Sequence, residues 1–436
     1  MVSITWEEAG VLKYKRSVAG IILLCIVSLI TAACSGKHSG DQGKVAGESL
    51  LSSSWDQVLA EAKGQTVNWY MWGGSDAINE FVDKKYGTLL KEQYNITLRR
   101  VPISDTAEAV NKVLNEKQAG KNEGGSVDLI WINGENFATL KQADALFGPF
   151  ATKLSNAKYV DYDNPAVAKD FGLETEGYES VWGSAQFQFV YDSKRIQPDE
   201  LPHNYQELKS WVKKHPGRFT YAAPPDFTGT RFVKQLFYEL SGGYEKWSKP
   251  FNQQEFNTEA SKAWDYLNEI KPSLWRDGET YPKTVAELTT LFNNNEVDFA
   301  FTQDIGGIAT EIGKGKLPKT ARPYVFDSGT IGDHHNVAIP YNATHKAAAM
   351  VVANLILEPK LQYEKADPTK GWGDGIGIDP SRLDGENKKL FDELKSKTRE
   401  TAVSADELLK HKLPDIQAAY TPALEEGWKN HVLFQK

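Results

Sequence analysis

The sequence predicts an α/β protein built on a parallel sheet, and two observations support this prediction. Five of the six residues from Val127 to Ile132 are apolar and three of those are β-branched, which is typical of a short strand buried on both faces. Strand-like and helical patterns also alternate strictly before that strand, which favours α/β order. The alternating segments are Thr66–Trp72, Ala77–Gln93, Ile96–Val101 and Thr106–Ala119.

The pattern changes after Tyr178. A strand pattern from Tyr178 to Ser193 is interrupted by small residues, which indicates a bend or a segment that changes sheets. Arg218–Tyr221 then reads as a strand, and a helix is expected over Phe232–Leu240. Thr228 or Thr230 could cap that helix.

The second half of the chain shows the same two kinds of pattern. Val297–Thr302 and Val337–Pro340 read as strands, and Ala347–Leu357 reads as a strongly apolar helix that stops at Glu358-Pro359. Further helical segments are expected over 264–270, 284–292, 388–395 and 405–410.

Composition limits the classes of function. The chain has 436 residues, a length that favours two or three domains, and a formal charge of -8, which argues against a general nucleic-acid surface. There are 12 Trp and 18 Tyr residues, most of which we expect in the core. The two cysteines are Cys25 and Cys34, so neither thiol chemistry nor a cysteine zinc site is available from Ser35 onward.

The N-terminus reads as an export signal. Basic residues precede an apolar run from Val18 to Ile30, and small residues then lead to Cys34. This segment resembles a bacterial lipoprotein signal, in which cysteine follows the cleavage site and carries the lipid. Thr31 departs from the leucine usual at its position, and plain secretion is the alternative. We therefore expect a signal peptide over 1–33, a lipid on Cys34 and a flexible tether over 34–54.

Several landmarks resemble the bacterial extracellular solute-binding proteins of ABC importers, family 1. They are Trp72-Gly73-Gly74-Ser75, Val127–Asn136, Phe187–Ser193 with the proline-bounded helix that follows, and Asn336–Pro359. The chain looks closest to the YnjB-type branch, which carries a thiamine-transport label. Segments of that branch are matched at 105–110, 127–137, 148–150 and 216–227.

The resemblance implies a two-lobe, periplasmic-binding-protein-like fold of type II, with discontinuous lobes and a ligand cleft at the hinge. Laid on this chain, lobe 1 covers 55–184 plus 336–365, and lobe 2 covers 185–335 plus 366–436. The implied function is capture of a small molecule, thiamine or a related cationic or aromatic compound, and its delivery to an ABC permease. The protein would be a monomer outside the bacterial cytoplasm, held to a membrane through its N-terminal lipid alone.

Candidate ligand-binding residues lie at strand ends or crossings that would face this cleft, where helix N-termini offer free N–H groups. Aspartates could meet a cation and aromatic rings could stack on a ring of the ligand. Each residue could equally be an ordinary turn or cap residue. The set is Trp72, Gly73, Asn133, Gln186, Asp226, Phe227, Thr228, Gln303 and Asp304.

The sequence argues against a metal site or a cofactor. His334 and His335 are adjacent, and neighbouring residues of a strand point to opposite faces, so they cannot easily chelate one ion. The rival class is a secreted α/β hydrolase or lyase that uses cleft carboxylates. No Gly-x-Ser-x-Gly or His-Glu-x-x-His motif supports it. A surface adhesion or scaffold protein is a third class, which an exposed flat apolar patch would favour.

Overall fold

The computed structural model describes residues 47–397 and 401–435, and its larger compact unit begins at Val45. Two sheets and two large hydrophobic cores divide this unit into two lobes. We call the residues around the core of Val67, Trp69 and Val351 the first lobe. The residues around the core of Phe189, Phe232 and Phe301 form the second lobe.

The main sheet has the strand order β12-β7-β11-β3-β1-β2. Strands β1, β2 and β3 are parallel, whereas β11 runs antiparallel to both β3 and β7. Along β1 buried and half-buried residues alternate, and β3 is buried almost throughout. The strands are β1 (Thr66–Trp72), β2 (Thr97–Ile103), β3 (Leu129–Ile132), β7 (Glu179–Gln186), β11 (Thr330–Pro340) and β12 (Gly375–Ile376).

The second lobe contains an antiparallel sheet of order β10-β8-β9. Its middle strand β8 is buried at every residue, because it lies between two partners under helices. These strands are β8 (Gln188–Asp192), β9 (Phe299–Thr302) and β10 (Ala321–Tyr324). Short strands elsewhere are β4 (Leu146–Phe147), β5 (Lys169–Asp170), β6 (Leu173–Glu174) and β13 (Lys412–Leu413).

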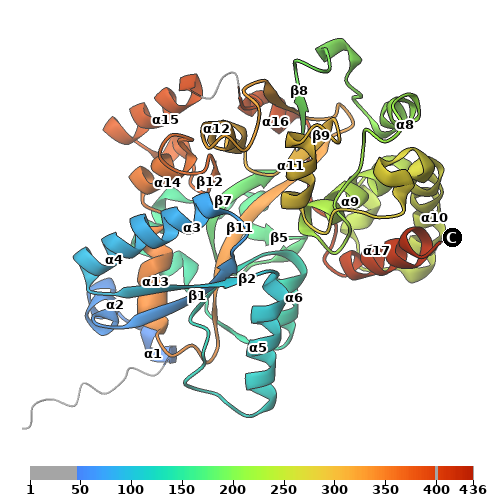
Figure 1. Ribbon diagram of the computed structural model, residues 1–436. Coiled ribbons are helices and arrows are strands. Elements are labelled where there is room, and N and C mark those ends of the chain that lie inside the picture. The colour runs from blue at the N-terminus through green and yellow to red at the C-terminus, as the bar shows by residue number, and fades with distance from the viewer. Residues whose placement is uncertain (1–46, 398–400, 436) are drawn as a thin grey trace, which may run out of the picture. The chain divides into compact units, whose positions relative to one another are not determined.

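Helices of the first lobe cover the main sheet (Figure 1). The most apolar of them, α13, packs against α2 and is buried at every residue after Lys346. A π-helical turn over Phe81–Tyr86 joins α3 to α4. The helices are α1 (Gly47–Ser52), α2 (Trp55–Ala62), α3 (Asp76–Glu80), α4 (Gly87–Tyr94), α5 (Thr106–Gln118), α6 (Gly134–Gln142), α7 (Pro165–Ala168), α13 (Lys346–Leu355), α14 (Pro359–Ala366) and α15 (Gly385–Lys397).

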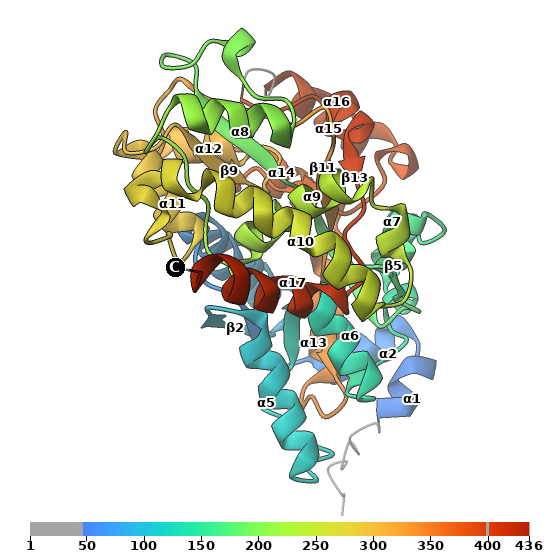
Figure 2. The same ribbon diagram turned by 90° about the vertical axis from the view of Figure 1, so that its right-hand side faces the viewer.

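Helices α9 and α10 pack together in the second lobe, and α17 lies against both of them (Figure 2). Helix α9 is buried over most of its length, since it carries Phe232, Val233 and Leu236 into the core. The helices are α8 (Tyr205–Lys214), α9 (Phe227–Ser241), α10 (Gln253–Ile270), α11 (Val285–Asn293), α12 (Gly307–Gly313), α16 (Ala405–Lys410) and α17 (Tyr420–Trp428).

Two neighbouring strands connect the lobes. Strand β11 pairs with β13 at Thr330 and Ile331 and with β3 from Asn336 to Ala338, and it is the long orange strand in the middle of Figure 1. Strand β7 follows it antiparallel, and the register shifts between His335 and Asn336. That shift leaves Trp182 as an extra residue on β7, which is a β-bulge at the crossing.

Most of the expected elements are confirmed, including β1, α5, β3, α13 and α16. Arg218–Tyr221 is wrong as a strand: its carbonyls accept hydrogen bonds from Asp298 and Trp275, which lie outside any ladder. The cap of α9 is also corrected, because Asp226, rather than either threonine, accepts the N–H groups of Thr228 and Gly229.

The end of the expected tether is folded. Residues 47–52 form α1, because Leu50 is buried in the first core and Leu51 packs against it. Cys34 and the signal lie outside the described residues. No helix within 47–397 and 401–435 is long and apolar enough to cross a bilayer.

The lobe boundaries themselves stay a prediction. Ile378, Leu383 and Phe391 pack in the core of the first lobe, whereas Ile416, Tyr420 and Trp428 pack in the core of the second. This packing argues for extending lobe 1 beyond Lys365 to include α15, with the last crossing between α15 and α16.

Candidate functional site

The expected residues of the first lobe lie at the carboxyl ends of its parallel strands. Trp72 is the last residue of β1, and the Gly73 N–H donates to the Ile103 carbonyl at the end of β2. Asn133 follows β3 and precedes α6, but its side chain makes no capping bond. All three are half-buried, so they remain available at this end of the sheet.

In the second lobe, the N-terminus of α9 holds three of the expected residues. Asp226 accepts from the N–H groups of Thr228 and Gly229 and from Val285, and burial raises the pKa of its carboxyl group. Phe227 is 40% exposed, which is unusual for phenylalanine in this protein. Its ring lies 4.4 Å from the guanidinium carbon of Arg231, one helical turn further along.

The remaining expected residues are joined to this helix end. The Gln186 N–H donates to the Gln303 carbonyl, and Gln303 Nε2 donates to Thr228 Oγ1 at 3.1 Å. The side chain of Gln186, however, is 3% exposed and donates to Thr330 Oγ1 and the Leu408 carbonyl. The side chain of Gln186 therefore stabilises the strands that cross between the lobes. Gln303 and Thr228 instead bond each other at the N-terminus of α9.

Arg231 is the centre of the second-lobe half of the site. Its side chain is fully buried, bonds Gln303 Oε1 and Asp333 Oδ2, and lies 3.4 Å from Asp415 Oδ2. Lys234, one turn later, pairs with Asp415 Oδ1 at 2.8 Å. The two cations of α9 are thus neutralised by Asp333 and Asp415.

Other carboxylates of the site are not neutralised in this way. The pKa of Glu425 on α17 is raised to about 7, chiefly by burial. Glu135 and Asp105 of the first lobe act in the same direction, while the Thr230 hydroxyl and the Lys234 ammonium act against it. Asp105 also raises the pKa of Asp226. Acidic groups of both lobes therefore lie within electrostatic range of one another. Within residues 47–397 and 401–435, no lysine or arginine forms an ion pair with Glu425, Glu135 or Asp226.

Asp304 adds a further carboxyl group after β9. Its side chain is half-buried, and burial together with the Asp374 carboxylate raises its pKa to about 8. We call Asp105, Glu135, Asp226, Asp304 and Glu425 the interlobe carboxylates.

A second set of charges lies at the crossing strands. Lys365 is fully buried and donates to Asp374 Oδ2 at 2.5 Å and to the carbonyls of Trp182 and Gly375. His335 Nε2 lies 2.9 Å from the same Asp374 oxygen. Although burial alone would raise it, His335 and Lys365 hold the pKa of Asp374 below its ordinary value. We call Lys365, His335 and Asp374 the hinge triad.

Tryptophan rings surround the hinge triad. Trp182 is fully buried, with its ring centroid 4.9 Å from Trp131 and 5.5 Å from His335. The Trp372 ring also packs against Trp182, with the two ring centroids 5.6 Å apart. Trp131 is half-buried, so this aromatic cluster reaches the surface at the end of β3.

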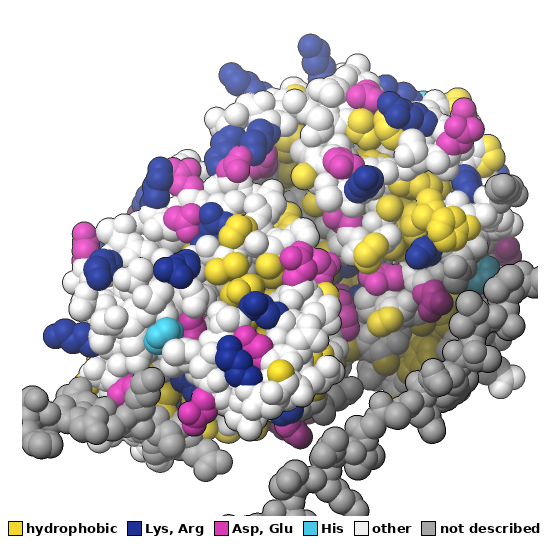
Figure 3. Space-filling view, turned by 60° about the horizontal axis from the view of Figure 1, so that its bottom comes forward, with side chains coloured by type: hydrophobic (Ala, Val, Ile, Leu, Met, Phe, Trp, Pro, Cys, Tyr) yellow, Lys and Arg dark blue, Asp and Glu magenta, His cyan; other side chains and the backbone are white. Residues whose placement is uncertain are grey.

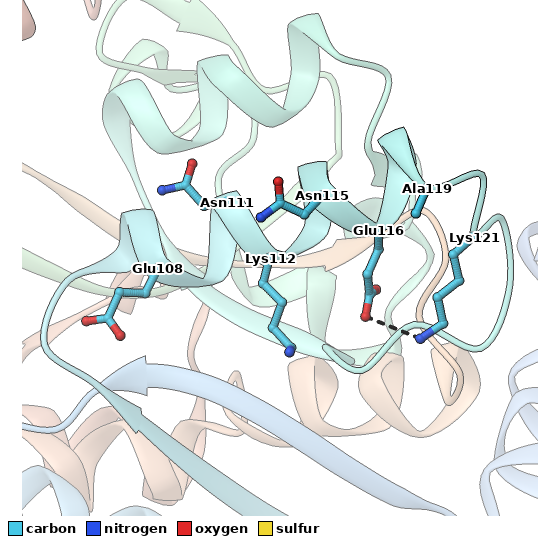
Figure 4. Close-up of a pocket in the computed structure, with 7 residues that line it drawn as sticks. All are labelled: Glu108, Asn111, Lys112, Asn115, Glu116, Ala119 and Lys121. Carbon is cyan, nitrogen blue, oxygen red and sulfur yellow. Dashed lines mark hydrogen bonds and ion pairs between the residues drawn. The ribbon is translucent and has the colours of Figure 1, made fainter. Parts of the chain in front are cut away.

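The outer surface has fewer features of a ligand-binding site than the region between the lobes. Figure 3 shows positive and negative side chains mixed over one face, with small hydrophobic patches between them. A shallow hollow of about 500 Å³ lies on α5 and the loop after it. Its long side chains diverge, and of those drawn only Glu116 and Lys121 are joined (Figure 4). Such a polar, open surface is a poor small-molecule site.

The candidate set lacked Asp105, Arg231 and Glu425, and Glu135 was not singled out within Val127–Asn136. Asp105 is the N-cap of α5 and Glu135 lies in the first turn of α6, so their positions at helix N-termini after expected strands could have identified them. Arg231 follows Phe227 at the spacing of one helical turn, which was a usable signal. Glu425 could not have been found, since only the fold brings α17 to α9. The described residues contain no group of three or more His, Asp or Glu side chains that could hold a metal ion.

Comparison with known proteins gives one consistent result. Residues 85–374 match the family described as bacterial extracellular solute-binding protein. Protein YnjB of Escherichia coli K12 is 38% identical over 378 residues, which cover 86% of this chain and 93% of that protein.

Solved structures share the fold at low identity. The spermidine/putrescine substrate-binding protein PotD from Streptococcus pneumoniae superimposes with a TM-score of 0.58 at 15% identity, over 84% of this chain and 99% of that one. The periplasmic binding protein AfuA from Actinobacillus pleuropneumoniae, with fructose-6-phosphate bound, gives 0.57 at 13% identity, over 85% and 99%.

Proposed function

The chain belongs to the bacterial extracellular solute-binding protein family, and on that premise we propose that its interlobe cleft captures a positively charged small molecule. The protein is the solute-binding component of an ABC importer. Members of this family bind substrates for a transporter and do not catalyse a reaction, so the hydrolase or lyase alternative is set aside.

The observation that carries this proposal is the surplus of carboxylates between the lobes. Arg231 and Lys234 are already paired with Asp333 and Asp415, which leaves the interlobe carboxylates without a protein cation in contact. Charged groups that are partly buried together repel one another and favour protonation. A ligand cation placed between Glu425 and Glu135 would relieve that repulsion.

Aromatic side chains support a ligand that carries a ring. Phe227 is 40% exposed with Arg231 over its ring, and Trp72 and Trp131 are half-buried at the ends of neighbouring strands. Stacking on such faces is favourable for flat or cationic groups. Thiamine, which combines a ring with a positive charge, is therefore the first compound to test.

The fold by itself does not identify the ligand. PotD is named for spermidine and putrescine, while AfuA was crystallised with a sugar phosphate, and both resemble this chain equally well. The charge of the cleft separates these cases, because a phosphate would meet the interlobe carboxylates as a like charge.

The remaining expectations complete the proposal. We propose that a signal peptide over 1–33 directs export, that Cys34 carries a lipid, and that the protein works as a monomer beside its permease. Intact mass measurement of the protein from membranes would test the lipid, since an unmodified N-terminus would remove it and leave solute binding unaffected.

The test of the ligand class is a thermal-shift screen at pH 7.5 with thiamine, thiamine phosphates, spermidine and fructose-6-phosphate. A one-site ligand at a hundred times its dissociation constant adds about 2.7 kcal/mol to the free energy of unfolding. We expect shifts with cations and none with the sugar phosphate. Stabilisation by fructose-6-phosphate alone would reject a cationic ligand.

A further inference from the structure

A small hairpin of the first lobe reaches the second lobe. Strands β5 and β6 pair at Lys169 with Glu174 and at Asp170 with Leu173. The base of the hairpin is fixed to α6, because Asp170 Oδ2 accepts the Gly134 N–H at 2.6 Å and Lys141 donates to the Glu174 carbonyl. The hairpin therefore moves with the first lobe.

Phe171, at the tip of this hairpin, is held in an unusual conformation. Its φ is +43°, a backbone region that a bulky residue rarely adopts, yet its side chain is 4% exposed. The ring lies against Gly134, where an added Cβ would come within 2.4 Å of it. The glycine at 134 therefore makes room for the ring, and its own φ of +59° also favours glycine.

Phe171 also contacts residues of the second lobe. The ammonium of Lys234 on α9 lies 4.5 Å from the ring centroid, and Ala418 joins Phe171 and Ala138 in a small buried cluster. The next residue, Gly172, has Gln417 beside it, with 4.0 Å between an added Cβ and the Gln417 Cα. One phenylalanine thus connects α6 of the first lobe to α9 and the segment before α17 of the second.

We propose that the β5–β6 hairpin is a latch that holds the two lobes closed, with Phe171 as the inserted side chain and Lys234 as its receiver. Opening the lobes would expose the ring and break its contact with the ammonium, while the backbone stays at a positive φ. Strain of this kind persists only where surrounding contacts impose it. The latch acts on the cleft proposed above, but it does not depend on the charge or identity of the solute.

The test measures the distance between the lobes in the ligand-free protein. Spin labels are placed by Lys112→Cys on α5 and Gln254→Cys on α10, both exposed, in a chain where Cys25 and Cys34 are replaced by serine. A second chain carries Gly172→Cys and Gln417→Cys as well, and oxidising these two before labelling gives a reference for the latched state. An added Cβ at Gly172 lies 4.0 Å from the Gln417 Cα, which brings the two cysteines together, at a φ of +76° that strains the new side chain.

We expect the distance between the two spin labels in the unmodified chain to be mainly that of the disulfide-locked reference. Phe171→Ala should lower the ratio of closed to open molecules by about tenfold or more, because both apolar burial and the cation–π contact are lost. Lys234→Met, which leaves the hairpin intact, should shift the ratio in the same direction by a smaller factor. Phe434→Ala, a truncation of an exposed phenylalanine outside the latch, serves as the matched control and should change nothing.

Two results would overturn the latch. One is an unmodified chain whose lobes lie further apart than in the locked reference. The other is a Phe171→Ala chain with the same distance distribution as the unmodified chain. If Phe171→Ala fails to fold, Phe171→Leu keeps the apolar bulk and loses the ring, and Lys234→Met tests the same contact from the other lobe. Neither failure bears on the solute screen, since no ligand is present.

Discussion

The molecule contains two groups of buried charge that differ in how they are balanced. In the hinge triad, Lys365 gives all of its N–H groups to Asp374 and two carbonyls, and His335 contacts the same carboxylate. Among the interlobe carboxylates, Glu425 has a threonine hydroxyl as its hydrogen-bond partner and acidic neighbours on the opposite lobe. The carboxylate of the first group contacts two cationic side chains within the protein, and Glu425 in the second contacts none.

This difference separates a structural charge cluster from a binding one. A buried ion pair with its hydrogen bonds made resists change, because removing either partner leaves an unpaired charge. A set of carboxylates with raised pKa values and no cation in contact instead marks a site that binds protons or a cationic ligand, and this describes Glu135, Asp226, Asp304 and Glu425. Four changes test this separation.

The largest effect is expected at the hinge triad. Lys365→Met leaves Asp374 without its closest cation and the Trp182 carbonyl without one of its donors, which should lower the free energy of unfolding by about 3–5 kcal/mol. Urea unfolding at pH 7 measures the loss. Lys360→Met, on the same helix but exposed, is the control and should stay within about 0.5 kcal/mol. Equal losses in both variants would contradict the structural role of the triad.

The next effect concerns Glu425 and depends on pH. Its pKa of about 7 in the folded protein is above its ordinary value, so its contribution is fully present at acidic pH and is lost as the pH rises through about 7. The ligand-free protein should lose on the order of 1–3 kcal/mol from this group between pH 4.5 and pH 7.5. Glu425→Gln should remove that slope, and its exposed neighbour changed by Glu426→Gln should keep it. The slope is read from urea unfolding at several pH values.

A smaller effect is expected for a carboxylate that is balanced by backbone dipoles. Asp226 accepts three N–H groups at the start of α9 and α11, so Asp226→Ala should cost about 1–2 kcal/mol. Asp226→Asn keeps an oxygen acceptor and should recover most of the loss. Thermal denaturation of the unmodified protein and of the two variants measures the loss. If asparagine recovered no stability, the charge of Asp226 itself would matter.

The smallest effect is expected at the surface. Asp76 and Lys316 join the two lobes in an ion pair of 3.2 Å, but both side chains are largely exposed. Lys316→Ala should change the free energy of unfolding by less than about 0.5 kcal/mol, and the difference should vanish in 0.5 M salt. A large, salt-independent loss would show that solvent does not screen this contact.

Local pattern predicts the elements of this fold better than it predicts the site. The composition of Val127–Ile132 predicts β3, because a strand buried on both faces must be apolar throughout. Asn133 and Trp72 were expected at strand ends for the same reason and lie there. The strand β11 was predicted only as Val337–Pro340, since Gly332, Asp333 and the two histidines interrupt the apolar pattern of its first half.

The parts that could not be predicted depend on distant pairing. Glu425 reaches the site because α17 packs on α9 through Tyr420, Leu424 and Trp428 in the second core. Gln186 has a polar side chain at a crossing, which suggested ligand contact, but the fold uses it to bond Thr330 and Leu408. A sequence shows which side chains can hydrogen-bond, and only the tertiary structure shows whether the protein has already used them.

The paired crossing strands have a consequence for how the lobes can move. Because β7 and β11 are hydrogen-bonded to each other from Gly332 to Ala338, they bend as one ribbon rather than as two independent linkers. The bulge at Trp182 interrupts this pairing at one place, and the Trp182 carbonyl freed there is held by Gln362 and Lys365 of α14. We therefore expect the lobes to bend together at one place, the bulge, rather than at two independently flexing linkers.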